Sequence, residues 1–426
     1  MRLYSTLQRG LVDLPAPPGP VRIYSCGPTV YARVHVGNAR PFVVPIWLRN
    51  WLRERGYESV LVHNITDIND KIYDAAPGAS ADLAARATAW YLEDTAALGI
   101  GMPDHLPKAT ETVPQIVAFV EALIAAGHAY AVEGDVYFRV ASDPGYGRLS
   151  RQRPEQMEDE ERNPRKEDPR DFALWKANKP GEDTWWDSPW GRGRPGWHIE
   201  CSVMAEELLG HEFEIHCGGL DLVFPHHENE LAQSRALGHE FARIWMHNGM
   251  LEFVGEKMSK SVGNVTTLHD ALARWGRETI LLFFMTAHWR KPLDFSEETM
   301  SQAGSQVETF RNALLGEGRE APAGEWERLA AVLDDDFNTP DALALLHEWR
   351  AAGLLELVRR GLGLFGLGSL GVRQEAPVEL VELAEGRLQA RRSRDFAEAD
   401  RLRDEIAAAG WEVRDEDGGF RLVRRA

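Results

Sequence analysis

The chain has 426 residues, of which 44% are hydrophobic, and a formal net charge of -18. This composition is enough to bury several cores, and the negative charge excludes a protein that binds nucleic acid non-specifically over its whole surface. No basic N-terminal segment leads into an apolar run, and the longest apolar run, 280–285, is too short to span a bilayer, so we expect a cytoplasmic protein without a membrane contact.

The first predicted elements form a strand, a helix and a second strand. The segment VRIYSC (21–26) predicts a short strand, and SVLVHNIT (59–66) predicts the second one. Between them, HVGNAR (35–40) begins a helix that extends to about Gly56. Such a unit is normally parallel and right-handed, which predicts the start of an α/β nucleotide-binding sheet.

The middle of the chain predicts an insertion between two halves of that sheet. Residues 151–195 are charged and rich in proline, and apolar alternation returns in EFEIHCGGLDLVF (212–224). The next segment, FPHHENE (224–230), places His226 and Glu230 four residues apart on one helix face, with Pro225 in the first turn. This segment alone fits either a metal site or a polar helix start on the surface.

Two motifs indicate binding of ATP. HVGN (35–38) lies at a strand-to-helix turn, where backbone N–H groups and the helix dipole attract phosphate. KMSKS (257–261) places Lys257 and Lys260 on a glycine-flanked loop, and each motif alone also fits an ordinary turn or a solvated basic loop. Together, in this order, they favour ATP chemistry.

The last third of the chain is predicted to be helical. After Arg277 apolar residues recur three or four apart, and Thr339 with Pro340 forms a helix start. The glycine-rich segment 361–371 precedes a tail whose helix ends at Gly410 and carries one apolar face, made by Phe396, Ala399, Leu402 and Ile406.

The chain resembles the cysteinyl-tRNA synthetases, a family of class I aminoacyl-tRNA synthetases, from about Leu3 to Arg424. The matching segments are CGPTVY (26–31), HVGNAR (35–40), NITDIND (64–70), GRPGWHIECS (193–202), FPHHENE (224–230), WMHNGM (245–250), KMSKSVGN (257–264) and DDDFNTP (334–340). The resemblance implies an α/β fold: a Rossmann-type parallel-sheet catalytic domain with an insertion, followed by a helical bundle and a small C-terminal anticodon-binding domain. The two halves of the Rossmann domain are expected at 1–110 and 196–250, with the connective insertion at 111–195 between them. A stem-contact region with the KMSKS loop is expected at 251–310. A shortened helical bundle at 311–370 and the anticodon-binding domain at 371–426 complete the chain.

The resemblance also implies an activity, cofactors and site residues. The expected enzyme is a monomer that activates L-cysteine with ATP and Mg²⁺ and transfers it to tRNA(Cys), with one Zn²⁺ per chain to select the substrate thiol. The implied zinc ligands are Cys26, Cys201, His226 and Glu230, and the implied cysteine-binding residues are Cys26, Gly27, Thr66, Trp197, His216 and Asp221. The implied ATP-binding residues are His35, Gly37, Asn38, Lys257, Met258, Ser259, Lys260 and Ser261, among which His35, Asn38, Lys257 and Lys260 are catalytic.

The ligand types agree with this expectation independently. Two thiols, an imidazole and a carboxylate form a mixed donor set that suits zinc. A purely structural zinc site is usually closed by ligands that are close in sequence, whereas these come from three distant segments. With three cysteines in a chain of this length, no disulfide framework is expected.

Some positions differ from the family pattern. Asn38 replaces the second histidine of the common class I motif, so we expect it to hydrogen-bond without a positive charge. Cys217 stands where a glycine is usual, and we expect it to be buried, although an oxidation-sensitive bystander is the alternative. Phe420 is a candidate for base stacking, and the arginines in 387–394 and 421–425 are candidates for phosphate contacts or a solvated helix face.

Two other functions fit part of this sequence. An enzyme of the same superfamily that joins cysteine to an amino sugar in mycothiol synthesis would share the zinc and ATP motifs but lack the C-terminal module. A non-catalytic zinc-containing RNA-binding protein would have no reason to keep both phosphate motifs. The sequence favours the synthetase.

Overall fold

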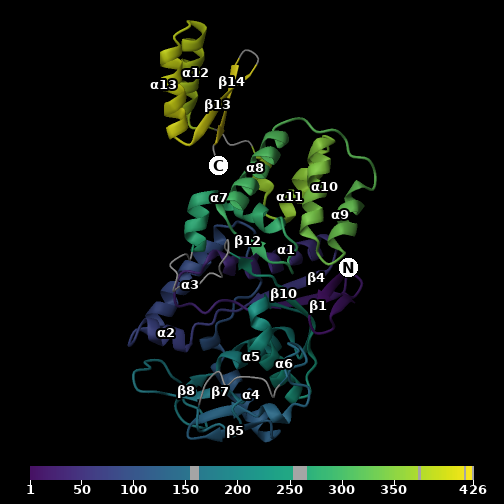
Figure 1. Cartoon of the computed structure of the whole chain (residues 1–426), viewed down its shortest axis with the longest axis vertical. Coiled ribbons are helices and arrows are strands. Elements are labelled where there is room, and N and C mark those ends of the chain that lie inside the picture. The colour runs from purple at the N-terminus through teal and green to yellow at the C-terminus, as the bar shows by residue number, and fades with distance from the viewer. Residues whose placement is uncertain (154–162, 253–265, 373–375, 417–418, 425–426) are drawn as a thin grey trace.

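The structure, a computed structural model, describes residues 1–153, 163–252, 266–372, 376–416 and 419–424 (Figure 1). Its central sheet has the strand order β10-β9-β3-β4, and every neighbouring pair is parallel. The strands are β3 (Pro20–Ser25), β4 (Glu58–His63), β9 (Glu212–Gly219) and β10 (Phe241–Asn248). The predicted α/β fold with a parallel sheet is therefore confirmed, and Cys26 directly follows β3.

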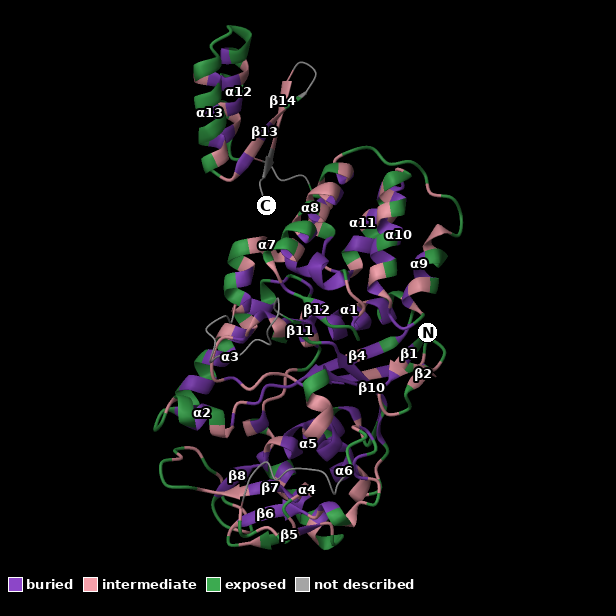
Figure 2. Cartoon of the chain, viewed as in Figure 1, coloured by how far each residue is buried: buried purple, intermediate pink, exposed green. Residues whose placement is uncertain are grey.

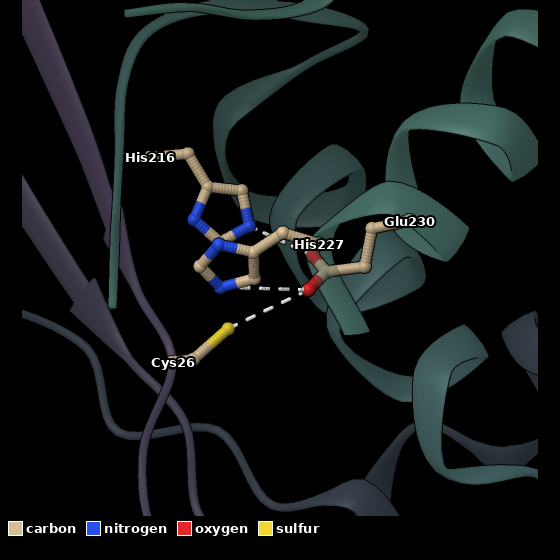
Figure 3. A group of neighbouring side chains, drawn as sticks. All are labelled: Cys26, His216, His227 and Glu230. Atoms are coloured by element: carbon tan, nitrogen blue, oxygen red, sulfur yellow. Dashed lines mark hydrogen bonds and ion pairs between the residues drawn. The ribbon is translucent and has the colours of Figure 1, made fainter. Parts of the chain in front are cut away.

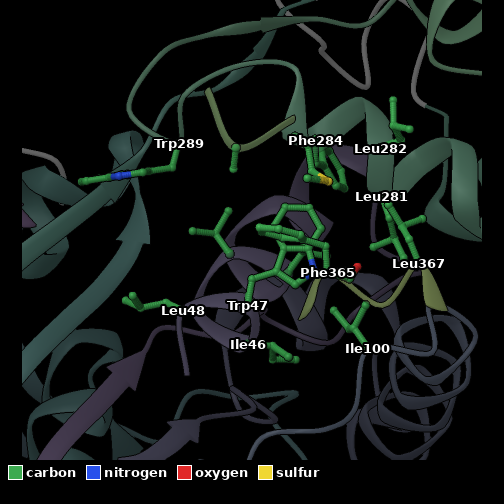
Figure 4. Close-up of a cluster of buried hydrophobic side chains, with 14 of the residues drawn as sticks. Ile46, Trp47, Leu48, Ile100, Leu281, Leu282, Phe284, Trp289, Phe365 and Leu367 are labelled. Carbon is green, nitrogen blue, oxygen red and sulfur yellow. Dashed lines mark hydrogen bonds between the residues drawn. The ribbon is translucent and has the colours of Figure 1, made fainter. Parts of the chain in front are cut away.

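Helix α1 (Arg40–Glu54) connects β3 to β4 and joins the sheet to the helical part of the chain. Pro41 lies in its first turn, where the missing N–H costs nothing. Trp47 of α1 packs edge-on against Phe365, with ring centroids 5.2 Å apart, and its Nε1 donates to the Phe365 carbonyl at 3.0 Å. Figure 4 shows these two rings beside Leu281 and Phe284 of α7 (Leu268–Met285), so one core spans the sheet and the helices after it.

A second, antiparallel sheet lies in the insertion between the halves of the parallel sheet. Its order is β5-β6-β7-β8, and it lies at the end of the molecule opposite the C-terminal helices (Figure 1). Strand β7 comes from the charged segment that sequence alone marked only as an interruption. The elements of this region are α4 (Val113–Ala125), β5 (Ala129–Val132), β6 (Asp135–Phe138), β7 (Phe172–Ala177), β8 (Gly193–Pro195) and α5 (Trp197–Leu209).

The helical part begins earlier than predicted, because α7 starts at Leu268 and bends at Gly276, where φ is 74°. Asn338 caps α10 with its side chain, and Pro340 lies in the first turn, as predicted. None of the helices within the described ranges is long and apolar enough to cross a membrane. The helices here are α7 (Leu268–Met285), α8 (Glu297–Leu314), α9 (Glu325–Leu333), α10 (Thr339–Ala351) and α11 (Leu355–Leu364).

Residues 376–416 and 419–424 form what we call the C-terminal unit. It consists of α12 (Val378–Arg392), α13 (Phe396–Ala408), β13 (Trp411–Glu416) and β14 (Gly419–Arg424). The predicted apolar face of α13 is correct for three of its four residues, which are buried, whereas Phe396 is 63% exposed. Figure 2 shows mainly exposed and half-buried residues here, so the unit has only a small core.

The remaining elements complete the sheet's surroundings. They are β1 (Arg2–Ser5), β2 (Gly10–Asp13), α2 (Asp70–Ala75), α3 (Ser80–Ala96), α6 (Glu228–Ala236), β11 (Leu251–Glu252) and β12 (Leu293–Asp294).

Candidate active site and metal centre

Two thiols, an imidazole and a carboxylate converge beside the carboxyl ends of the parallel strands. Cys26 follows β3, Cys201 lies in α5, and Glu230 lies in the first turn of α6. The donor atoms of these residues and of His226 all lie within 4.8 Å of one another, and all four residues are buried. The structure thus brings the four predicted zinc ligands together.

The spacing of these atoms fits a tetrahedral zinc ion. Bonds of about 2.3 Å to sulfur and about 2.1 Å to oxygen place ligand atoms about 3.8 Å (S to S) and about 3.6 Å (S to O) apart. The Cys26 and Cys201 sulfurs are 3.8 Å apart, and Cys26 Sγ lies 3.6 Å from Glu230 Oε1. His226 Nε2 lies 3.1 Å from the same oxygen, slightly closer than the about 3.4 Å of a tetrahedral N and O pair.

The electrostatics of the group also favour a cation. Burial raises the pKa of the Cys26 thiol well above its usual range, and Cys201 and Glu230 raise it further. Burial likewise raises the pKa of Cys201 and lowers the pKa of His226 to about 3, so this imidazole is neutral at pH 7. Two buried thiols stay protonated in such surroundings unless a metal ion stabilises their thiolates.

Two further histidines lie against Glu230. Figure 3 shows His216 and His227 facing the Glu230 carboxylate, and Cys26 pointing at its Oε1 atom. His216 Nε2 lies 2.8 Å from Oε2, whereas His227 Nε2 lies 4.0 Å from Oε1. These histidines with Cys26 and Glu230 form an alternative donor group, but it has one thiol, and His216 already occupies the second oxygen. We therefore take His216 as the residue that orients Oε1 toward Cys26.

The neighbours that hold the other ligands were not identified from sequence. His198 Nδ1 lies 3.0 Å from His226 Nδ1, which leaves His226 Nε2 for the metal. Asn64 Oδ1 accepts from the Gly27 N–H at 2.9 Å and lies 3.7 Å from Cys201 Sγ. The sequence signals for Asn64 were its place near the end of the predicted strand 59–66 and in the family segment NITDIND (64–70).

The helix containing Glu230 starts differently from the prediction. Residues Val223–His227 form a π-type turn with extended backbone at Phe224, and α6 begins only at Glu228. Glu228, two residues before Glu230, is buried and accepts from the Ser150 N–H at 2.7 Å instead of joining the metal group. Replacing Glu228 would therefore break a structural contact, so it is a poor control for Glu230.

A cavity opens beside the metal group. Six of the predicted cysteine- and ATP-binding residues line it: Cys26, Gly27, His35, Asn38, Trp197 and Asp221. The Trp197 ring lies 4.4 Å from the His226 ring, measured between centroids. Thr66 and His216 are buried and lie outside this lining, so their contact with cysteine stays a prediction.

Gly27 in the cavity lining and Gly37 beside it permit close approach of neighbouring groups. A Cβ atom at Gly27 would lie 1.7 Å from the Asn64 carbonyl oxygen, and one at Gly37 would lie 2.9 Å from the His35 ring. Residues 36–39 form a 3-10 turn directly before α1, and Asn38 is exposed. The turn therefore presents an amide and a helix N-terminus to the cavity.

Cys217 is buried, as predicted, and belongs to neither donor group that includes Cys26. Its sulfur lies 3.9 Å from the Met246 sulfur. The KMSKS residues Lys257, Met258, Ser259, Lys260 and Ser261 lie outside the described residues.

Arg40, the first residue of α1, joins the nucleotide motif to the end of β10. Its guanidinium is 1% exposed and donates to the carbonyl oxygens of Gly249 and Lys291, both at 2.7 Å, and of His288 at 2.9 Å. Burial lowers its pKa to about 10. Through these three hydrogen bonds, the Arg40 guanidinium fixes the start of α1 against Gly249 and against the segment 288–291.

Replacing Arg40 by methionine is expected to destabilise the protein by about 3 kcal/mol or more, because three buried carbonyls lose their donor. Urea unfolding followed by circular dichroism measures this loss. Arg53→Met is the matched control on the same helix, where the arginine side chain is 45% exposed, and it should cost about 1 kcal/mol or less. Equal losses in the two variants would contradict the role assigned to Arg40.

Fold and site together define a class I aminoacyl-tRNA synthetase: residues 14–305 match the model of the tRNA synthetases class I (C) catalytic domain, and residues 328–352 match the DALR domain. The chain belongs to the cysteine–tRNA ligase family. It is 42% identical to the cysteine–tRNA ligase of Symbiobacterium thermophilum, covering 100% of this chain and 99% of that one. It is 44% identical to that of Halorhodospira halophila, covering 96% of both chains.

A solved structure supports the fold alone. The methionyl-tRNA synthetase of Mycobacterium tuberculosis, in complex with methionyl-adenylate, superposes with a TM-score of 0.56 at 15% identity, covering 87% of this chain and 84% of that one.

Proposed function

We propose that the protein activates L-cysteine with ATP to form cysteinyl-adenylate and transfers the cysteinyl group to tRNA(Cys). The observation that carries this proposal is the buried group of Cys26, Cys201, His226 and Glu230, because it meets a cavity lined by His35 and Asn38. One site thus offers a thiol-selective metal position beside a phosphate-binding turn.

The metal position accounts for the choice of amino acid. A bound zinc ion supplies a soft Lewis acid that favours a thiolate over a hydroxyl group at neutral pH. Around it, Trp197 and Asp221 at the cavity wall would hold the rest of the cysteine, and Asn64 would keep Gly27 in place through its 2.9 Å contact. Serine differs by one atom, and an apolar pocket alone gains only about 1–3 kcal/mol from such a difference.

Activation needs alignment and charge stabilisation more than a protein nucleophile. The amino-acid carboxylate attacks the α-phosphate of ATP, pyrophosphate leaves, and Mg²⁺ accompanies the nucleotide. His35, Gly37 and Asn38 would hold the phosphates at the start of α1, where Arg40 fixes the backbone. Lys257 and Lys260 would neutralise the negative charge of the triphosphate as it rearranges. Their neighbours Met258, Ser259 and Ser261 would bind ATP with them.

ATP–pyrophosphate exchange with each amino acid in turn tests the proposed function. Cysteine should support exchange, and serine should support it about 10,000-fold less well, a ratio typical of sites that bind a specific polar group. Exchange with another amino acid, or comparable rates with serine, would contradict the proposal.

Replacing Lys260 by alanine is expected to slow adenylate formation about 100-fold with little change in cysteine affinity. The reason is that its charge acts mainly on the departing pyrophosphate, an interaction stronger in the transition state than in the ground state. Single-turnover kinetics separate the two quantities. An equal loss of binding and rate would count against this role.

We further propose that the enzyme acts in the cytoplasm as a monomer. Large exposed hydrophobic residues among those described occur singly along the sequence, for example Leu220 and Val378. Analytical ultracentrifugation should give one species of monomer mass.

A further inference from the structure

A second cluster of metal-ligating side chains lies at the opposite edge of the parallel sheet. Glu206 belongs to the last turn of α5, His211 directly precedes β9, and His239 lies two residues before β10. Because Glu212 and Phe241 are paired in register, the two histidines reach the amino ends of neighbouring strands. The cavity lies at the carboxyl ends, about 25 Å away along an eight-residue strand.

The two histidines converge on one carboxylate oxygen of Glu206. Glu206 Oε2 lies 2.8 Å from His211 Nδ1 and 2.7 Å from His239 Nδ1. The two imidazole rings stack, with centroids 3.8 Å apart and planes inclined by 23°. The side chain of Glu206 is 4% exposed, whereas that of His211 is 68% exposed, so the group is anchored inside and open to solvent on one side.

Hydrogen bonding within the protein leaves this group incomplete. The ion pairs of Glu206 among the described residues involve only the two histidines, and its buried Oε1 has no hydrogen-bond partner there. A buried carboxylate without adequate partners is costly.

A divalent cation would satisfy all three donors. Two neutral imidazoles and one carboxylate are ligands that zinc and other late first-row divalent ions accept, and the exposed carboxylates of Glu212 and Glu240 next in sequence add negative charge. Tetrahedral zinc separates N and O ligands by about 3.4 Å, so both histidine nitrogens must move about 0.6–0.7 Å away from Glu206 Oε2. The side chains of His211 and His239 are 68% and 21% exposed, which leaves each of them a side open for this movement.

We propose that Glu206, His211 and His239 form a second metal site, for Zn²⁺ or a similar divalent ion, independent of the Cys26 group and of the proposed function. Three protein ligands leave a fourth position for water. The ion would join the end of α5, the start of β9 and the turn before β10, and so stabilise the folded chain by binding only that form.

Equilibrium dialysis of the full-length, zinc-containing protein against micromolar Zn²⁺ tests the site. The protein should hold about two zinc ions per chain, and His211→Ala should hold about one. His105→Ala, at an exposed histidine outside the cluster, is the matched control and should keep about two. Glu206→Gln keeps the side-chain volume and should weaken the second zinc at least about tenfold.

Thermal stability provides a second readout, with enzymatic activity as its control. Added Zn²⁺ should raise the melting temperature of the wild type and not that of His211→Ala, while cysteine-dependent ATP–pyrophosphate exchange stays unchanged in both. One zinc per chain in the wild type, or two in His211→Ala, would overturn the proposal. Failure of cysteine activation itself would instead contradict the proposed function.

Discussion

Replacing Cys201 by alanine is expected to remove the bound zinc and to lower cysteine-dependent ATP–pyrophosphate exchange by about 10,000-fold. The sulfur of Cys201 lies 3.8 Å from that of Cys26, and both are buried, so no water or other thiol can replace it without rearrangement. Loss of this ligand also removes the group that distinguishes a thiol from a hydroxyl. Metal analysis and exchange assays measure the two effects.

Cys217→Ala is the matched control for this experiment. Cys217 is buried as completely as Cys201, yet its sulfur contacts Met246 and lies outside the donor groups that include Cys26. Its removal should cost about 1 kcal/mol of stability and leave zinc content and exchange unchanged. If Cys201→Ala kept full activity, or if a metal-free preparation activated cysteine and rejected serine, the zinc assignment would be wrong.

Truncation after Gly371 is expected to leave exchange intact and to lower tRNA charging about 1,000-fold. The ligands of the Cys26 group and the cavity residues precede residue 232, and Leu370, which packs into the main core, is retained. The reason for the loss is that two linked contacts with one ligand bind it about 100- to 10,000-fold better than one contact. Aminoacylation assays with tRNA(Cys) measure it.

Charge substitutions in the full-length chain refine this test. Arg387 is buried and donates to Asp415 at 2.7 Å, so it holds the C-terminal unit together instead of meeting phosphate. Arg392 and Arg394 are exposed, and reversing both charges should weaken charging and its dependence on salt, with exchange unchanged. Unchanged charging by the truncated protein would defeat the anticodon-module assignment and favour a small amine as the acceptor.

Local sequence patterns predicted the parts of the fold that depend on neighbouring residues. The strand at 21–26, the helix that follows HVGN and the second strand at 59–66 correspond closely to β3, α1 and β4, because their apolar periodicity and turn residues agree with the final packing. Thr339 and Pro340 likewise predicted the start of α10, which begins at Thr339. The proposed zinc ligands were implied by the family resemblance, because the His226–Glu230 spacing alone also fitted a polar helix start on the surface.

Contacts between distant segments could not be predicted in this way. Strand β7 follows a charged, proline-rich stretch and is stabilised by pairing with β6 and β8, which no local pattern reveals. The contact between His198 and His226 depends on how α5 meets the turn before α6. Phe420 shows the same limit, since it packs partly against the core of the C-terminal unit, so base stacking by it stays a proposal.

The small core of the C-terminal unit has a thermal consequence. Its buried apolar residues are Leu380, Ala384, Ile406, Trp411 and Val413. A unit of about 50 residues rarely gains more than about 3–5 kcal/mol from such a core, far less than the large core around Trp47 can supply. On heating, the C-terminal unit should therefore unfold before the rest of the chain. The enzyme would then bind tRNA more weakly while it still forms the adenylate. Bound tRNA should raise the temperature of this first unfolding step.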